Sequence, residues 1–126
     1  MKNKIVGSYY AGNECVQLVL MPGYGGEFYT TPEDGAIARI KVGADDDWNG
    51  ALTALFHEIF ELMFDRVKCR LRPTNDISRS TASYIFVADH QDFGDVCARC
   101  AEFVNECLPD FTKEFKNWKK ATKKEG

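Results

Sequence analysis

Three residues of one short segment, His57, Glu58 and Glu61, have the types and the spacing that metal chemistry requires. His57 and Glu61 are four residues apart, and on a helix this spacing places two side chains on the same face, with Cβ atoms about 5–6 Å apart. An imidazole and a carboxylate on that face could bind one metal ion. Glu58 projects about 100° further around the helix, where its carboxylate could take a proton from a water molecule that the ion activates.

The segment differs by one residue from the H-E-x-x-H helix of zinc hydrolases, which carries two ligands one turn apart and a general base between them. Glu61 takes the place of the second histidine here, and a carboxylate oxygen is an acceptable zinc ligand. A catalytic zinc site also needs a third protein ligand and one open position. The other histidine of the chain, His90, follows a short apolar run at the predicted start of a helix. We therefore predict zinc bound by His57, Glu61 and His90, with Glu58 as the catalytic base. Manganese or iron would accept the same mixture of nitrogen and oxygen ligands.

A purely structural interpretation of the segment stays open. Glutamates are common on helices, so Glu58 and Glu61 could simply face solvent, and His57 could be a core histidine that binds a backbone carbonyl. Apolar residues surround the segment, however, and an ionised glutamate among them without a partner would cost free energy. A bound metal ion would offset this cost, which favours the metal interpretation.

Other patterns in the sequence offer weaker metal chemistry. Asp45-x-Asp47-x-Asn49-Gly50 matches the first half of a calcium-binding loop, but Phe56 stands where position 12 needs a bidentate glutamate. The residue one turn after Glu61, at position 65, is an aspartate that could be an extra ligand or could hold a histidine in place, and it could equally be a surface charge.

The five cysteines are expected to be free thiols, because their number is odd and the N-terminal residues do not resemble a signal peptide. Cys97 and Cys100 have the spacing of a zinc or redox motif. They fall with Cys107 on the apolar side of a predicted helix, however, where cysteine packs as a small hydrophobic residue. The glycine-rich segment 23–26 lacks the lysine that ends a phosphate-binding loop, so we interpret it as a flexible connection.

The fold that must position these residues is predicted to be α+β, with an N-terminal antiparallel sheet packed on a long helix. Apolar residues that alternate between turn-forming segments predict the strands, and apolar residues at three- and four-residue steps predict the helix that carries His57. A strand and C-terminal helices follow, with a break at Pro109. The expected elements are strands over residues 4–10, 15–21, 27–31 and 36–43, a helix over 48–70, a strand over 84–88, a helix over 89–108 and an amphipathic segment over 111–118.

Length and composition predict a single domain over residues 1–126. A chain of 126 residues with 44% hydrophobic residues suits a globular protein. No apolar run is long enough to cross a membrane and no signal peptide is expected, so we predict a cytoplasmic protein without a membrane partner. The net charge is -3, although six lysines make residues 113–125 basic. The acidic remainder argues against a nucleic-acid-binding domain, because phosphate contacts need a basic face.

The order of strands, an H-E-x-x-E helix and a further helix resembles zincin-like domains, and most of all the small zincin-like proteins encoded in phage and prophage genomes. The resemblance covers residues 48–108 and is carried by the segments 54–61 (ALFHEIFE) and 86–90 (FVADH). It implies that His57, Glu61 and His90 are metal ligands and that Glu58 is the catalytic base of a zinc-dependent, metallopeptidase-like hydrolase. The alternative is a non-catalytic protein-binding module, a phage or prophage accessory protein on a degenerate zincin-like scaffold.

Overall fold

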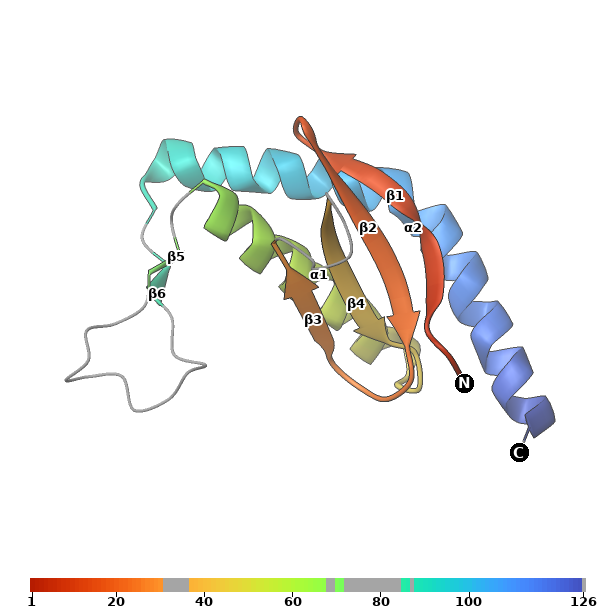
Figure 1. Ribbon diagram of the computed structural model, residues 1–126. Coiled ribbons are helices and arrows are strands. Elements are labelled where there is room, and N and C mark those ends of the chain that lie inside the picture. Colours follow the sequence, from red (N-terminus) through yellow and green to blue (C-terminus); the bar gives the residue numbers. More distant parts are fainter. Residues whose placement is uncertain (31–36, 68–69, 72–84, 87, 126) are drawn as a thin grey trace.

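The fold combines one sheet with two helices, and the predicted α+β class is confirmed. The computed structural model describes residues 1–30, 37–67, 70–71, 85–86 and 88–125. The strands of the main sheet are β1 (Lys4–Ala11), β2 (Glu14–Met21), β3 (Gly26–Tyr29) and β4 (Ala38–Gly43), and their spatial order is β1-β2-β4-β3 (Figure 1). The helices are α1 (Trp48–Arg66) and α2 (His90–Glu125).

The sheet is mixed, so the prediction of an antiparallel sheet is wrong for one pairing. β1 with β2 and β3 with β4 are antiparallel, but β2 and β4 run parallel, with Val16 opposite Ala38 and Met21 opposite Gly43. β3 precedes β4 in the chain yet lies beyond it, at the edge of the sheet. The alternation of apolar residues predicts strands and their faces but not their neighbours, which is why this arrangement was not foreseen.

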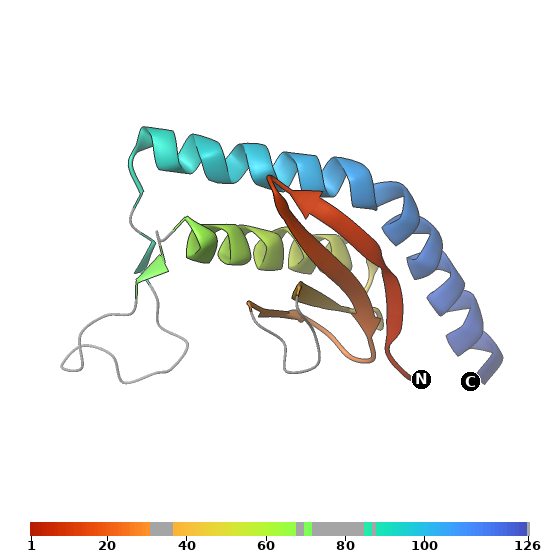
Figure 2. The same cartoon turned by 45° about the horizontal axis from the view of Figure 1, so that its top comes forward.

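Both helices cover one face of the sheet, and the core lies between these two layers (Figure 1 and Figure 2). α1 packs on β3 and β4, α2 packs on β1, and the two helices also contact each other. On the covered face of the sheet, alternate residues of β2 and β4 supply buried side chains. They are Val16, Leu18, Leu20, Ala38, Ile40 and Val42, and Val19 of β2 is buried as well.

The predicted interruption at Pro109 is wrong, because α2 continues through it as one helix. Proline removes a backbone hydrogen bond and crowds the preceding turn, and α2 changes direction along its length in Figure 2. Buried residues recur at three- and four-residue steps on both sides of the proline, so packing against the rest of the fold offsets its cost. These residues are Phe103, Cys107, Phe111, Phe115 and Trp118.

The predicted strand over residues 84–88 is also corrected. The strand present is β6 (Ile85–Phe86), which pairs with β5 (Arg70–Leu71) and not with the main sheet, while residues 84 and 87 lie outside the described residues. Apart from the pair of short strands β5 and β6, the chain has four strands followed by two helices. The prediction had instead placed a helix, a strand and several helices after the N-terminal strands. Within the described ranges, neither helix is long and apolar enough to cross a membrane.

The end of α1 is fastened to the sheet by a single arginine. Arg66 Nε donates to both carboxylate oxygens of Glu14 in β2 at 2.8 Å, and Arg66 Nη2 donates to the backbone carbonyl of Thr30 at 2.6 Å. Such paired contacts of a guanidinium with a carboxylate are directional. They therefore hold α1 in a fixed orientation over β2 and the end of β3.

Candidate metal centre

The helix α1 carries the candidate site, and its first turn is defined by Asp47. The Oδ1 atom of Asp47 accepts a hydrogen bond from the backbone N–H of Gly50 at 2.7 Å, which caps the helix. One side of α1 then faces the sheet with Ala51, Leu55, Ile59 and Leu62, all fully buried. His57 lies on another side, and 62% of its side chain is exposed. Glu58 lies between the two sides and only 7% of its side chain is exposed.

The ligand atoms of His57, Glu58 and Glu61 converge. His57 Nε2 lies 3.5 Å from Glu61 Oε1 and 3.8 Å from Glu58 Oε1. One ligand atom from each of the three residues lies within 4.8 Å of the other two. Two atoms bound tetrahedrally to zinc at about 2.0–2.1 Å would be separated by about 3.3–3.4 Å. The group therefore has the donor types and the spacing of a metal site, and the expectation that His57 and Glu61 share a face is confirmed.

The close approach of β3 to α1 depends on Gly26. A Cβ atom at this position would lie 2.7 Å from Glu58 Cγ and 3.1 Å from the backbone oxygen of Lys41. Any residue other than glycine would thus displace the buried Glu58 side chain from its place against the strand. The sequence interpretation missed this role, because it treated segment 23–26 as a flexible connection. The available signal was a glycine directly before a predicted strand, since glycine in or beside a strand often marks a close backbone approach.

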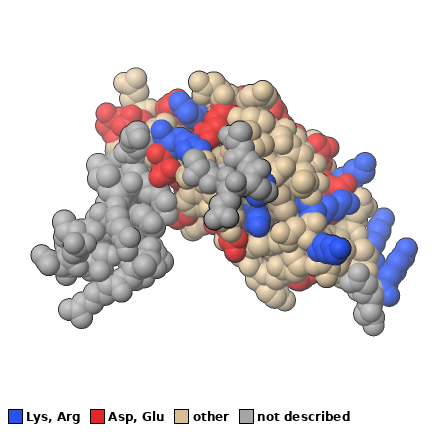
Figure 3. Space-filling model, in the orientation of Figure 1, with Lys and Arg blue, Asp and Glu red and all other residues tan. Residues whose placement is uncertain are grey.

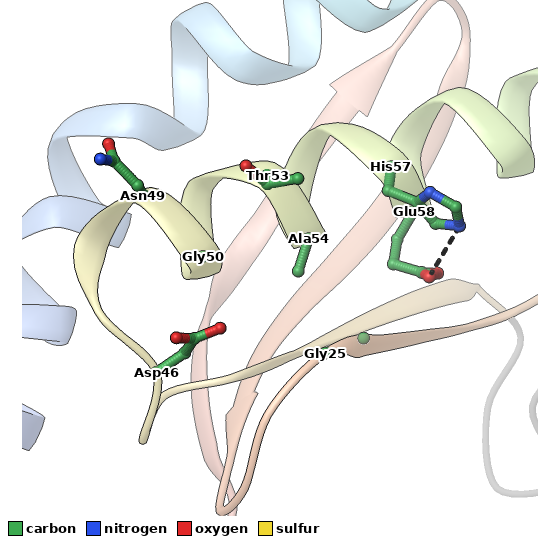
Figure 4. A pocket seen from close by; sticks show the side chains of 9 residues that line it. Gly25, Asp46, Asn49, Gly50, Thr53, Ala54, His57 and Glu58 are labelled. Atoms are coloured by element: carbon green, nitrogen blue, oxygen red, sulfur yellow. Dashed lines mark ion pairs between the residues drawn. The ribbon is translucent and has the colours of Figure 1, made fainter.

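A cleft of about 500 Å³ lies between the first half of α1 and the start of β3. Figure 4 shows Gly25 on the strand side, Gly50, Thr53 and Ala54 on the helix side, and His57 with Glu58 at one end. Asp46 lies at the opposite end, and its carboxylate points into the cleft. Most of the lining side chains are small, so a chain molecule could lie between the helix and the strand.

The strand-side wall of the cleft is held by Asp45. Its Oδ2 atom accepts a hydrogen bond from the backbone N–H of Gly23 at 2.6 Å, and its Oδ1 atom accepts one from Trp118 Nε1 at 3.0 Å. These two donors, Gly23 first, lower the pKa of Asp45 below its usual value because they stabilise the carboxylate. The neighbouring backbone is fixed as well, since Gly43 N–H donates to the carbonyl of Gly25 at 2.7 Å. The segment interpreted as flexible is therefore tied to β4 and, through Trp118, to α2.

His90 lies outside the converging group. It is the first residue of α2 and is exposed, after Asp89, whose Oδ1 atom accepts a hydrogen bond from the N–H of Asp92 at 2.8 Å. Near these ends of α1 and α2, the rings of Phe64 and Phe93 are in contact, with centroids 6.2 Å apart. The assignment of His90 as the third ligand stays a prediction. Asp65 is also outside the group that the described residues form.

The other motifs have structural roles in the parts of the chain that the structure describes. Asp47 caps α1 and Asp45 holds the 23–26 segment, which leaves the calcium-loop pattern without support. Cys100 and Cys107 are buried in the core, as predicted, and burial raises the pKa of each thiol to about 12. The cysteines at positions 15, 97, 100 and 107 are free thiols, and Cys69 lies outside the described residues.

Comparisons of the chain with known proteins found no family model, no curated protein and no solved structure that matches. No family or homologue therefore stands behind the resemblance to zincin-like proteins. The group of His57, Glu58 and Glu61 and the cleft beside it are the features from which a function can be argued.

Proposed function

We propose that the protein is a metal-dependent hydrolase that acts on peptide bonds, with zinc as the metal. The observation that carries the proposal is the convergence of one imidazole and two carboxylates at the end of a cleft. Acidic groups alone often cluster without an ion. Here the 3.5 Å separation of His57 Nε2 and Glu61 Oε1 matches what two ligands of one zinc ion require.

The three side chains take different roles in this proposal. His57 and Glu61 hold the ion, and His90 remains the candidate for a third protein ligand. A zinc ion in such a site supplies a Lewis acid, which lowers the pKa of water and polarises a carbonyl group. Glu58 accepts the proton of the attacking water at its carboxylate and passes it to the leaving amine. Its burial against Gly26 holds this carboxylate in one place, which a general base needs.

The position of β3 supports an extended peptide as the substrate. β3 is an edge strand of the sheet, and its first residue, Gly26, lines the cleft next to Glu58. An extended peptide can add to the edge of a sheet through backbone hydrogen bonds, and pockets beside it then select side chains. A peptide placed along this edge would bring a backbone carbonyl beside His57 and Glu58.

Metal content and metal affinity test the proposal. The purified protein without an affinity tag would be analysed by elemental mass spectrometry and titrated with zinc by calorimetry, alongside His57→Ala, Glu61→Gln, Glu58→Gln and His90→Ala. We expect about one equivalent of zinc, with at least a tenfold loss of affinity in the first two variants, because each loses one ligand. Glu58→Gln should keep the metal and lose cleavage of a casein or mixed-peptide substrate.

The His90→Ala and Glu58→Gln variants separate three outcomes. Loss of metal in His90→Ala supports the predicted three-ligand site. If His90→Ala keeps its zinc affinity and Glu58→Gln loses it, Glu58 is a ligand. That outcome refutes the role of Glu58 as the base. A protein that binds no zinc, manganese or iron refutes the hydrolase proposal and favours a protein-binding module.

A further inference from the structure

The cleft beside the metal centre carries the carboxylate of Asp46 at its far end. Its lining includes the carboxylates of Asp46 and Glu58 but no Lys or Arg side chain of the described residues. The lysines of the described residues lie outside this lining, most visibly at the C-terminal end of α2 (Figure 3), although Lys119 reaches the backbone carbonyl of Asp46. An ion held by His57 and Glu61 would offset the charge of Glu58. Asp46 would then remain the negative group of the cleft.

The local structure directs the Asp46 carboxylate into the cleft. Its Oδ1 atom accepts a hydrogen bond from the N–H of Asp47 at 2.8 Å, which fixes the side chain. Gly50 makes room for it, since a Cβ atom there would overlap Asp46 Oδ2. Lys119 donates to the backbone carbonyl of Asp46 and forms no ion pair with its carboxylate. The carboxylate thus keeps its capacity to bind a cation from the cleft side (Figure 4).

We propose that Asp46 binds a cationic side chain of the substrate, so that the site selects peptides with lysine or arginine near the cleaved bond. This inference rests on the proposed function. Asp46 lies beside Gly50, and the seven helical steps from Gly50 to His57 span about 10 Å. An extended peptide advances about 3.3 Å per residue, so the basic residue falls about three positions from the cleaved bond. The small lining side chains leave space for its aliphatic stem.

Binding and cleavage of designed peptides test the proposal separately. The probes are capped alanine-rich octapeptides in which one lysine occupies each position in turn, with norleucine peptides as neutral matches. Binding is measured by fluorescence polarisation to the zinc-loaded Glu58→Gln variant, and cleavage by mass spectrometry with the zinc-loaded wild type. Asp46→Asn, made in both backgrounds, removes the charge. Asp47→Asn is the matched control, because it removes a neighbouring charge while asparagine still caps the helix.

We expect lysine peptides to bind about tenfold more tightly than norleucine peptides, as one charge-assisted hydrogen bond allows. Asp46→Asn should abolish the difference and Asp47→Asn should preserve it. Equal binding or cleavage of the two peptide series, or a preference that survives in Asp46→Asn, overturns the inference and leaves the hydrolase proposal standing. Selective binding through Asp46 without cleavage of any peptide supports the inference and refutes the hydrolase. Absence of both binding and cleavage overturns both.

Discussion

Replacing Gly26 by alanine tests the contact between β3 and α1 on which the candidate site depends. The new Cβ atom would lie 2.7 Å from Glu58 Cγ and 3.1 Å from the backbone oxygen of Lys41. Overpacking of this kind costs about 1–3 kcal/mol. Removing a glycine from a strand returns about 0.5–1 kcal/mol. We therefore expect the free energy of unfolding to fall by about 1–2 kcal/mol, and peptide cleavage to fall as well, because the displaced Glu58 is the proposed general base.

Urea unfolding followed by circular dichroism measures this loss of stability, and two comparisons identify its cause. Gly94→Ala is the matched control: Gly94 lies in α2 and a Cβ atom there meets nothing within 4 Å. That variant should gain about 0.5–1 kcal/mol, since alanine is the better helix residue. Gly26→Ala should also be made in a Glu58→Ala background, where the atom it would meet at 2.7 Å is absent.

The double-mutant comparison gives the result that would refute the reasoning. We expect the cost of Gly26→Ala to shrink by about 1 kcal/mol when Glu58 is alanine, because contacting residues have coupling energies of this size. An equal cost in both backgrounds would mean that Glu58 does not pack on β3. A Gly26→Ala protein as stable as the wild type, with unchanged peptide cleavage, would contradict the proposed closeness of strand and helix altogether.

Two further predictions follow from the pKa shifts. The pKa of Asp45 is lowered by the Gly23 N–H and the Trp118 Nε1–H, so its stabilising effect is present above its usual pKa and is lost as pH falls through the lowered value. In acid-unfolding curves, Asp45→Asn should be less stable than the wild type near neutral pH, and the difference should shrink as pH falls below the usual pKa of an aspartate. A difference that stays constant with pH would contradict this. Burial raises the pKa of the Cys100 and Cys107 thiols to about 12. In the native protein at pH 8, iodoacetamide should therefore label these two thiols far more slowly than the half-buried Cys15 and Cys97. Labelling is followed by peptide mass spectrometry, and equal rates for the four cysteines would refute the prediction.

The fold could be predicted from the sequence where its determinants are local. The apolar residues of α1 recur at helical steps, and those of β2 and β4 alternate, so both kinds of element and their buried faces were readable. The parallel pairing of β2 with β4 was not readable, because no residue in either strand specifies its neighbour. The helix break predicted at Pro109 was wrong for a similar reason. The cost of the proline is local, whereas the burial of Phe111 and Trp118 that offsets it depends on distant residues, Trp48 of α1 for Phe111 and Asp45 of the loop after β4 for Trp118.

The metal-binding group was likewise predictable only where its determinants are local. His57, Glu58 and Glu61 lie within five consecutive residues of one helix, so helix geometry alone predicted that His57 and Glu61 would share a face and that Glu58 would lie beside them. Their surroundings come from distant segments. Gly26 approaches Glu58 only because β3 lies at the edge of the sheet, and His90 was assigned from its residue type and from the resemblance, without any local geometry that could place it.

The cleft itself depends on contacts across the whole chain, and this is why no motif revealed it. One of its walls is held where Gly23, Asp45 and Trp118 meet, and these residues come from the loop after β2, the loop after β4 and the C-terminal half of α2. A change at Trp118 therefore acts on the wall opposite His57 without contacting any ligand. The candidate ligands lie close together in the sequence, whereas the walls of the cleft come from distant segments. The sequence of such a protein therefore predicts where a reaction could occur, and only the fold indicates which kind of substrate could bind there.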